Sequence, residues 1–206
     1  MDDIIALLKK SGAILEGHFV GSSGRHLSNY INKDVLLPDT QLLSRLCRDI
    51  AEKHFTYGID AVVSPAAAGI PLSQWTAYHL SELTGKTIHA VFTEKTKEDS
   101  QILKRSSFQK LVQGKRILIV DDTTTVGSSV TKVKHAIEEA GGVPIAIAVI
   151  FNRDPQRVNA HTLGVPFSSL AVVPMESYEP HEVPEWLARV PIDITIGHGA
   201  KVVQQS

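Results

Sequence analysis

The feature that most constrains the fold is an apolar strand pattern that runs directly into two acids and a small-residue loop. Ile117–Val120 is a run of four apolar residues, typical of a strand buried on both faces of a parallel sheet. Asp121 and Asp122 end the predicted strand, and small residues as far as Ser129 lead into an amphipathic helix. A strand, a short loop and a helix in this order form the repeating unit of an α/β fold.

The same stretch carries the groups that would bind a phosphorylated sugar. Ligands of open α/β sheets bind outside the carboxyl ends of the strands, where paired carboxylates suit a sugar diol or a hydrated Mg²⁺. Backbone N–H groups and hydroxyls at a helix N-terminus suit a phosphate. The candidate phosphate-binding residues are Thr123, Thr124, Thr125, Val126, Gly127, Ser128 and Ser129. The alternative is a strand that ends in acids and a helix that begins with a hydroxyl cap.

These residues resemble the motif of the type I phosphoribosyltransferases, which bind 5-phosphoribosyl-1-diphosphate (PRPP). Asp121 and Asp122, followed by Thr125–Ser128, match that pattern, and Val126 stands where the family has Thr, Ala or Gly. The resemblance implies an α/β fold of the type I phosphoribosyltransferase kind. Its central, mostly parallel sheet is flanked by helices, and its N-terminal segment forms a small hood.

Composition limits the class of protein. The 206 residues fit one α/β domain (1–206), and a net charge of −1 gives no field that would favour nucleic acid or a membrane surface. The longest apolar run, Ile145–Phe151, is too short to span a bilayer, and the acidic start Met1–Asp3 lacks the basic region of a secretory signal. The single Cys47 lies on a helical apolar stripe, which favours a buried thiol over a nucleophile. A cytoplasmic protein that acts on small molecules is expected.

Strand and helix patterns alternate along most of the chain. The expected helices are 40–55, 71–83, 130–140 and 156–163. The expected strands are 59–63, 87–92, 117–120, 145–151 and 167–173. The segment 93–113 is polar and predicts either a long surface hairpin or a mobile active-site loop.

A second strand–loop–helix junction resembles the family's loop for the diphosphate of PRPP. Its residues are Ser64, Pro65, Ala66, Ala67, Ala68 and Gly69. Their small side chains let the backbone approach an anion at a helix N-terminus, although a plain turn is the alternative. Ala68 stands where the orotate branch of the family carries a lysine.

From about residue 12 to residue 170 the chain resembles the orotate phosphoribosyltransferase branch. The hood, about 1–35, would cover the base with Phe19 and Ser22, and Ser22 replaces the family's lysine. Arg153 follows an apolar strand, as does the family's arginine for the orotate carboxylate, and a guanidinium suits that group. The alternative is a surface Arg153 paired with Asp154 or Glu176.

The resemblance implies transfer of phosphoribose from PRPP to orotate, giving orotidine 5′-monophosphate and diphosphate, with Mg²⁺ as cofactor and a homodimer as the assembly. Asp121 and Asp122 would hold the ribose, with Mg²⁺ held through PRPP and water. Lys95 and Lys97, in the mobile loop 93–113, would neutralise the diphosphate unless they are ordinary surface charges. The loop departs from the family because it begins with Glu94 and lacks the usual His and Gly. Two other functions stay open: transfer to a purine or another base, and non-catalytic PRPP binding by a regulator.

Overall fold

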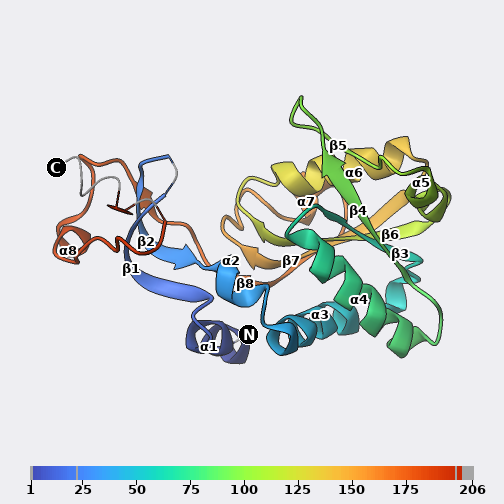
Figure 1. Cartoon of the computed structure of the whole chain (residues 1–206), viewed down its shortest axis with the longest axis horizontal. Coiled ribbons are helices and arrows are strands. Elements are labelled where there is room, and N and C mark those ends of the chain that lie inside the picture. Colours follow the sequence, from blue (N-terminus) through green and yellow to red (C-terminus); the bar gives the residue numbers. More distant parts are fainter. Residues whose placement is uncertain (1, 22, 198, 201–206) are drawn as a thin grey trace. The chain divides into compact units, whose positions relative to one another are not determined.

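The computed structural model describes residues 2–21, 23–197 and 199–200 and divides the chain into two compact units (Figure 1). The first unit combines the chain up to Leu36 with the chain from Pro174 onward, and the second runs from Leu37 to Val173. The predicted hood segment falls in the first unit. The sheet and both predicted phosphate-binding loops fall in the second.

The second unit contains a six-stranded sheet in the order β5-β4-β3-β6-β7-β8. Its strands are β3 (Ala61–Pro65), β4 (His89–Lys95), β5 (Gln101–Ile102), β6 (Arg116–Thr124), β7 (Val143–Asn152) and β8 (Phe167–Val172). Every neighbouring pair is parallel except β4 with β5. The expected mostly parallel sheet is therefore confirmed.

Helices cover both faces of this sheet (Figure 1). On one face α3 (Thr40–His54), followed by the 3₁₀ turn Phe55–Tyr57, packs against α4 (Gly69–Thr84). The other face carries α5 (Ser106–Val112), α6 (Ser128–Glu139) and α7 (Ala160–Leu163). Alternate strand residues face the two helical layers, so Ile117 and Ile119 join Val133 and Ile137 of α6 in one fully buried cluster. Burial of each such side chain contributes roughly 1.5–3 kcal/mol.

The first unit is built around a three-stranded antiparallel sheet in the order β1-β2-β9. Its elements are α1 (Asp2–Lys10), β1 (Ile14–Val20), β2 (His26–Ile31), α2 (Lys33–Leu36), β9 (Ser177–Tyr178) and α8 (Glu185–Ala188). The pairs His26–Tyr178 and Leu27–Ser177 join the two ends of the chain. Arg25 reinforces the junction by donating to the Ser177 carbonyl oxygen at 2.9 Å and to Glu179.

Several strand ends predicted from the sequence are wrong by one to four residues, and those of β6 and β3 lie at the two predicted loops. β6 continues through Asp121 and Asp122 to Thr124, because β7 pairs with it as far as Asn152. β3 continues to Pro65, where the sequence predicted that the strand would break. The ladder between β3 and β6 ends at Val63, so the proline nitrogen, which faces that side, interrupts no hydrogen bond.

The last predicted helix is also shorter than expected, beginning at Ala160 instead of residue 156. The Asn159 side chain accepts from the backbone of His161 and Thr162 and so fixes the helix start.

The polar segment 93–113 forms a hairpin followed by a helix. β4 continues to Lys95 and pairs with β5 through Glu94–Ile102 and Lys95–Gln101. The buried Thr93 hydroxyl donates to Gln101 Oε1 at 2.7 Å, and α5 follows from Ser106. Of the two structures that the sequence allowed, the hairpin is present; mobility of the segment stays a prediction.

Candidate functional site

The two predicted phosphate-binding loops follow neighbouring strands. From β3 the chain passes through α4 to β4 on one side, and from β6 it passes through α6 to β7 on the other. The strand order therefore reverses between β3 and β6. Such a switch point, at the carboxyl ends of parallel strands, is where open α/β sheets bind their ligands.

The two acids lie inside β6 and are almost completely buried. Asp121 is 6% exposed and Asp122 is 3% exposed. The Asp121 carboxylate accepts the backbone N–H of Asp122 at 2.9 Å. Adjacent buried carboxylates are expensive for a fold. Their presence at the carboxyl end of a central strand therefore favours a role in binding.

The loop after these acids forms the start of α6. Gly127, the N-cap, has a φ of 78°, and its N–H donates to Thr124 Oγ1 at 3.2 Å. This left-handed backbone explains the glycine. Val126 is half exposed, so its departure from the family pattern places an extra side chain at the surface. The Thr123 hydroxyl is buried and has no hydrogen-bond partner among the described residues.

The predicted diphosphate loop runs from the end of β3 into α4. Ser64 is fully buried, and its hydroxyl donates to Ser73 Oγ at 3.1 Å. The Ala66–Ala67 peptide bond is cis, and the Ala66 N–H donates to the Thr93 carbonyl oxygen at 2.9 Å. Ala67 and Ala68 follow at the start of the helix, and neither supplies the cation that the family places here.

Arg153 directly follows β7 and is connected to the neighbouring loop. Its backbone N–H donates to the Thr124 carbonyl oxygen at 2.8 Å. With 8% of its surface exposed, Arg153 is buried, so the alternative of a surface arginine is wrong. Burial lowers the pKa of the guanidinium because desolvation disfavours its charged form. A buried cation of this kind suits an anionic ligand group.

The two predicted loop lysines differ in their surroundings. Lys95, at the end of β4, forms an ion pair with Asp99. Lys97 is exposed and has no ion pair or hydrogen bond with another described residue. Both residues lie on the hairpin that continues β4 beyond the switch-point edge of the sheet.

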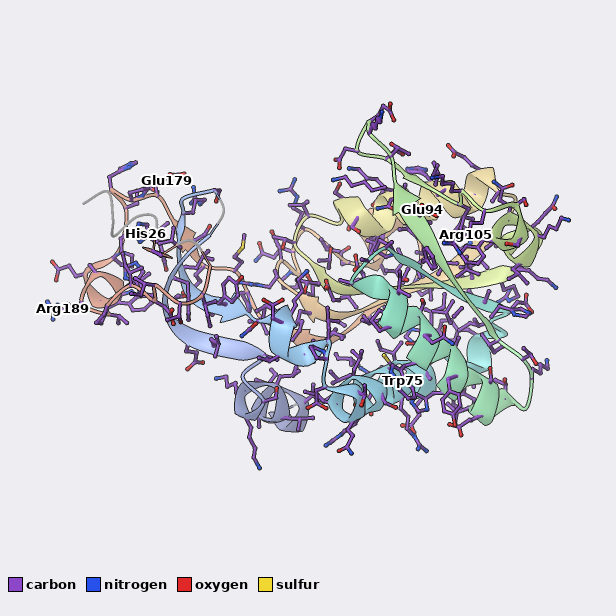
Figure 2. All side chains as sticks on the ribbon, viewed as in Figure 1. His26, Trp75, Glu94, Arg105, Glu179 and Arg189 are labelled. Carbon is purple, nitrogen blue, oxygen red and sulfur yellow. The ribbon has the colours of Figure 1, made fainter. Side chains whose placement is uncertain are left out.

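The base of this hairpin is held by Arg105. Its guanidinium carbon lies 5.2 Å from the ring centre of Phe92 and 5.3 Å from that of Phe108. The same group points toward Glu94, with 3.8 Å between Nε and Oε1 (Figure 2). Arg105 is therefore a structural contact of the hairpin.

The two predicted base-contacting residues of the hood belong to the first unit. Phe19 is 3% exposed and packs against Tyr30, with 5.6 Å between ring centres. Ser22 lies outside the described residues. A contact of either residue with a base stays a prediction.

The described residues could supply only some of the ligands of a Mg²⁺ ion. No group of three or more His, Cys, Asp or Glu side chains in the described ranges could hold a metal ion. Asp121 and Asp122 offer the hard oxygen donors that Mg²⁺ prefers, and Mg²⁺ commonly takes its other ligands from water and substrate phosphates.

Sequence reasoning missed one contact near the candidate site. Lys132 of α6 reaches Asp99 of the hairpin at 2.5 Å. The two residues are 33 positions apart. No periodicity or motif connects them, so only the fold could reveal the pair.

Comparison with known proteins agrees with this geometry. The family model described as phosphoribosyl transferase domain matches residues 37–165. Orotate phosphoribosyltransferase of Caldicellulosiruptor saccharolyticus is 34% identical over 91% of this chain and 92% of its own length. The enzyme of that name from Bartonella henselae is 35% identical over 92% of this chain and 93% of its own length.

Among the described residues, no helix is long and apolar enough to cross a membrane. Solved structures with a similar fold exist. The crystal structure of Mycobacterium tuberculosis orotate phosphoribosyltransferase matches with a TM-score of 0.65 and 21% identity. It covers 82% of this chain and 94% of that one. The chain belongs to the phosphoribosyltransferase family, in its orotate phosphoribosyltransferase branch.

Proposed function

We propose that this protein transfers the phosphoribosyl group of PRPP to orotate, a step of pyrimidine biosynthesis. The observation that carries the proposal is that the two loops predicted to bind anions follow the neighbouring strands β3 and β6, at the switch point of the sheet. PRPP has a phosphate at one end of its ribose and a diphosphate at the other, so it needs two such loops. The relatives that cover nine-tenths of the chain carry the name of this enzyme.

The 5-phosphate would lie in the loop Thr123–Ser129, on the N–H groups at the start of α6. Asp121 and Asp122 would accept hydrogen bonds from the ribose hydroxyls. The buried Thr123 hydroxyl supports this assignment, because a buried donor without a protein partner suits a polar ligand. The diphosphate would lie in the loop Ser64–Gly69, where the helix N-terminus favours negative charge.

In the reaction, a nitrogen of the base forms a bond to C1 of the ribose. The bond from C1 to the diphosphate oxygen breaks, and its electron pair leaves with the diphosphate, which can also accept the proton that the base nitrogen loses. The protein contributes alignment of the two reactants and charge stabilisation of the leaving group. Mg²⁺ would be held by PRPP and water near Asp121 and Asp122. Its positive charge would neutralise part of the negative charge of the diphosphate. Lys95 and Lys97 would approach the same group from the hairpin.

Arg153 supports orotate as the acceptor. Orotate carries a carboxylate, and a buried guanidinium next to the phosphate loop can hold it by two parallel hydrogen bonds. The ring nitrogen of orotate that forms the new bond carries a proton, and this proton can pass to the departing diphosphate. The lack of a histidine in the segment 93–113 of this chain therefore does not prevent the reaction.

We propose a cytoplasmic homodimer as the working form. Tyr78 on α4 is 50% exposed and lies edge-on to Trp75, with 5.8 Å between ring centres. An exposed tyrosine beside a half-buried tryptophan suits a protein interface. Sedimentation of wild-type protein and of Tyr78→Ser tests this, and a monomeric wild type would contradict it.

The function is tested by following orotate absorbance and diphosphate release with PRPP and Mg²⁺, and then with a panel of purine and pyrimidine bases. Turnover with orotate is expected. Turnover restricted to another base would move the assignment to that base, and PRPP binding without turnover would indicate a regulator.

A paired variant tests the site. Asp121→Asn with Asp122→Asn should abolish PRPP binding. Asp60→Asn is the control, because Asp60 accepts from the Arg116 backbone at the opposite end of β6. Unchanged PRPP affinity in the first variant would refute the site.

A further inference from the structure

The tip of the β4–β5 hairpin places one carboxylate between two lysines. The turn is closed by the Thr96 N–H, which donates to the Ser100 carbonyl oxygen at 3.0 Å. Within it Asp99 has a φ of 61°, and no other non-glycine residue in the described part of the chain has a positive φ. Aspartate is one of the few residues that adopt this backbone readily. The turn therefore holds the Asp99 side chain in a defined position.

Each carboxylate oxygen of Asp99 binds a different lysine. Oδ1 accepts from Lys95 on the same hairpin, and Oδ2 accepts from Lys132 Nζ of α6 at 2.5 Å. These bonds, that of Lys132 first, lower the pKa of Asp99 to about 2. The carboxylate is therefore ionised at any working pH.

The two lysines belong to elements that lead to the candidate site. Lys95 is the last residue of β4, and Lys132 is the fifth residue of the helix that begins at the phosphate loop. Asp99 thus ties the hairpin tip to α6. The base of the hairpin is held separately by Arg105, Phe92 and Phe108. Loss of Asp99 would release the tip and leave the base in place.

We propose that Asp99 competes with the diphosphate of PRPP for Lys95. In the free protein Asp99 forms the ion pair with Lys95 and fixes the hairpin tip, and on binding the diphosphate of PRPP replaces Asp99 as the partner of Lys95. The inference rests on the proposed function. Asp99, Lys95 and Lys132 are all partly exposed, with side-chain exposures of 61%, 64% and 33%. Exposed pairs of this kind are weak, so a diphosphate, with more charge than one carboxylate, can exchange for Asp99. Asp99 is a positioning residue that competes with substrate.

The proposal predicts that two variants change the affinity for PRPP in opposite directions. Asp99→Asn keeps a residue that tolerates the left-handed backbone and frees Lys95, so PRPP should bind up to about fivefold more tightly at low salt. Lys132→Gln leaves the Asp99 carboxylate to Lys95 alone, so PRPP should bind more weakly. In the Asp99→Asn background, Lys132→Gln should have a much smaller effect, because Lys132 acts through Asp99.

The experiment measures the dissociation constant of Mg·PRPP calorimetrically, and the KM for PRPP and kcat in turnover, for wild type, both single variants and the double variant. Glu138→Gln is the control. It removes one carboxylate of α6 that is paired with Lys134 at 2.8 Å and is not part of the hairpin. Tighter PRPP binding with lower KM in Asp99→Asn, weaker binding in Lys132→Gln and an unchanged control support the proposal.

Weaker or unchanged PRPP binding in Asp99→Asn overturns the inference, as do additive effects of the two changes. If wild type binds PRPP and turns over orotate in that case, the proposed function stands and only the role of Asp99 fails. If wild type binds no PRPP, both fail.

Discussion

Gly69, at the junction of the predicted diphosphate loop and α4, offers a direct test of that loop. A Cβ at this position would lie 2.8 Å from the Cβ of Ser64 and 3.2 Å from Pro65 Cδ. Neither neighbour can move easily. Ser64 is fully buried and hydrogen-bonded to Ser73, and Pro65 is a rigid ring within β3. Overpacking of this kind costs about 1–3 kcal/mol, so Gly69→Ala should strain the loop by that amount.

The strain divides between folding and binding. The free protein can lower the strain energy by shifting the loop. If PRPP binds only to the original loop position, the strain energy that the shift had removed is restored on binding. Gly69→Ala should therefore lose more unfolding free energy with saturating Mg·PRPP than without it. Urea titrations under both conditions measure the difference.

Two variants sharpen the Gly69 experiment. Gly85 ends the same helix with a φ of 67° and open space around it, so Gly85→Ala should lose about 1–2 kcal/mol equally with and without PRPP. Ser64→Gly removes the closest contact, so it should recover about 1 kcal/mol or more when combined with Gly69→Ala. Equal losses with and without PRPP in Gly69→Ala would refute the assignment of this loop to the ligand.

Three further predictions follow from burial. Burial lowers the pKa values of His26 and His54, and His18 lowers that of His26 further. As the pH drops below about 6.5, these histidines therefore bind protons in the unfolded chain before they do so in the folded protein. The free energy of unfolding should fall by about 1.4 kcal/mol for each pH unit by which folding lowers a pKa. Equal urea midpoints at pH 7.5 and 5.5 would contradict this. Burial raises the pKa of Cys47 to about 12, so iodoacetamide should label the thiol only after unfolding, and rapid labelling of the native protein would disprove its burial. Arg153→Ala should raise the KM for orotate at least tenfold and leave PRPP affinity unchanged, whereas an equal loss for both substrates would assign Arg153 to the fold.

The parts of the fold that depend on local pattern could be predicted from the sequence. Ile117–Val120 is buried on both faces, as four consecutive apolar residues require. The ends of the strands were predicted less well, because pairing with neighbouring strands determines where a strand ends. β6 continues through two acids only because β7 extends beside it, and β3 includes Pro65 only because the β6 ladder has already ended.

Contacts between distant segments could not be predicted. The ends of the chain join through pairs such as His26 with Tyr178, and neither strand has a pattern that names its partner. The burial of Arg153 depends on the neighbouring strand and loop, so the sequence left a surface position open. The contact between Asp99 and Lys132 depends on how the hairpin turns toward α6, which no residue pattern records.

The two ends of the proposed substrate site differ in a way that the reaction explains. The groups assigned to the ribose and the acceptor, Asp122 and Arg153, are buried on central strands or directly after them. The cations assigned to the diphosphate, Lys95 and Lys97, are exposed on a hairpin beyond the sheet. Rigid, desolvated groups hold reactants in line, whereas a leaving group must be neutralised and then released. Exposed lysines, one of them paired with the Asp99 carboxylate, can do both because their ion pairs are weak in water.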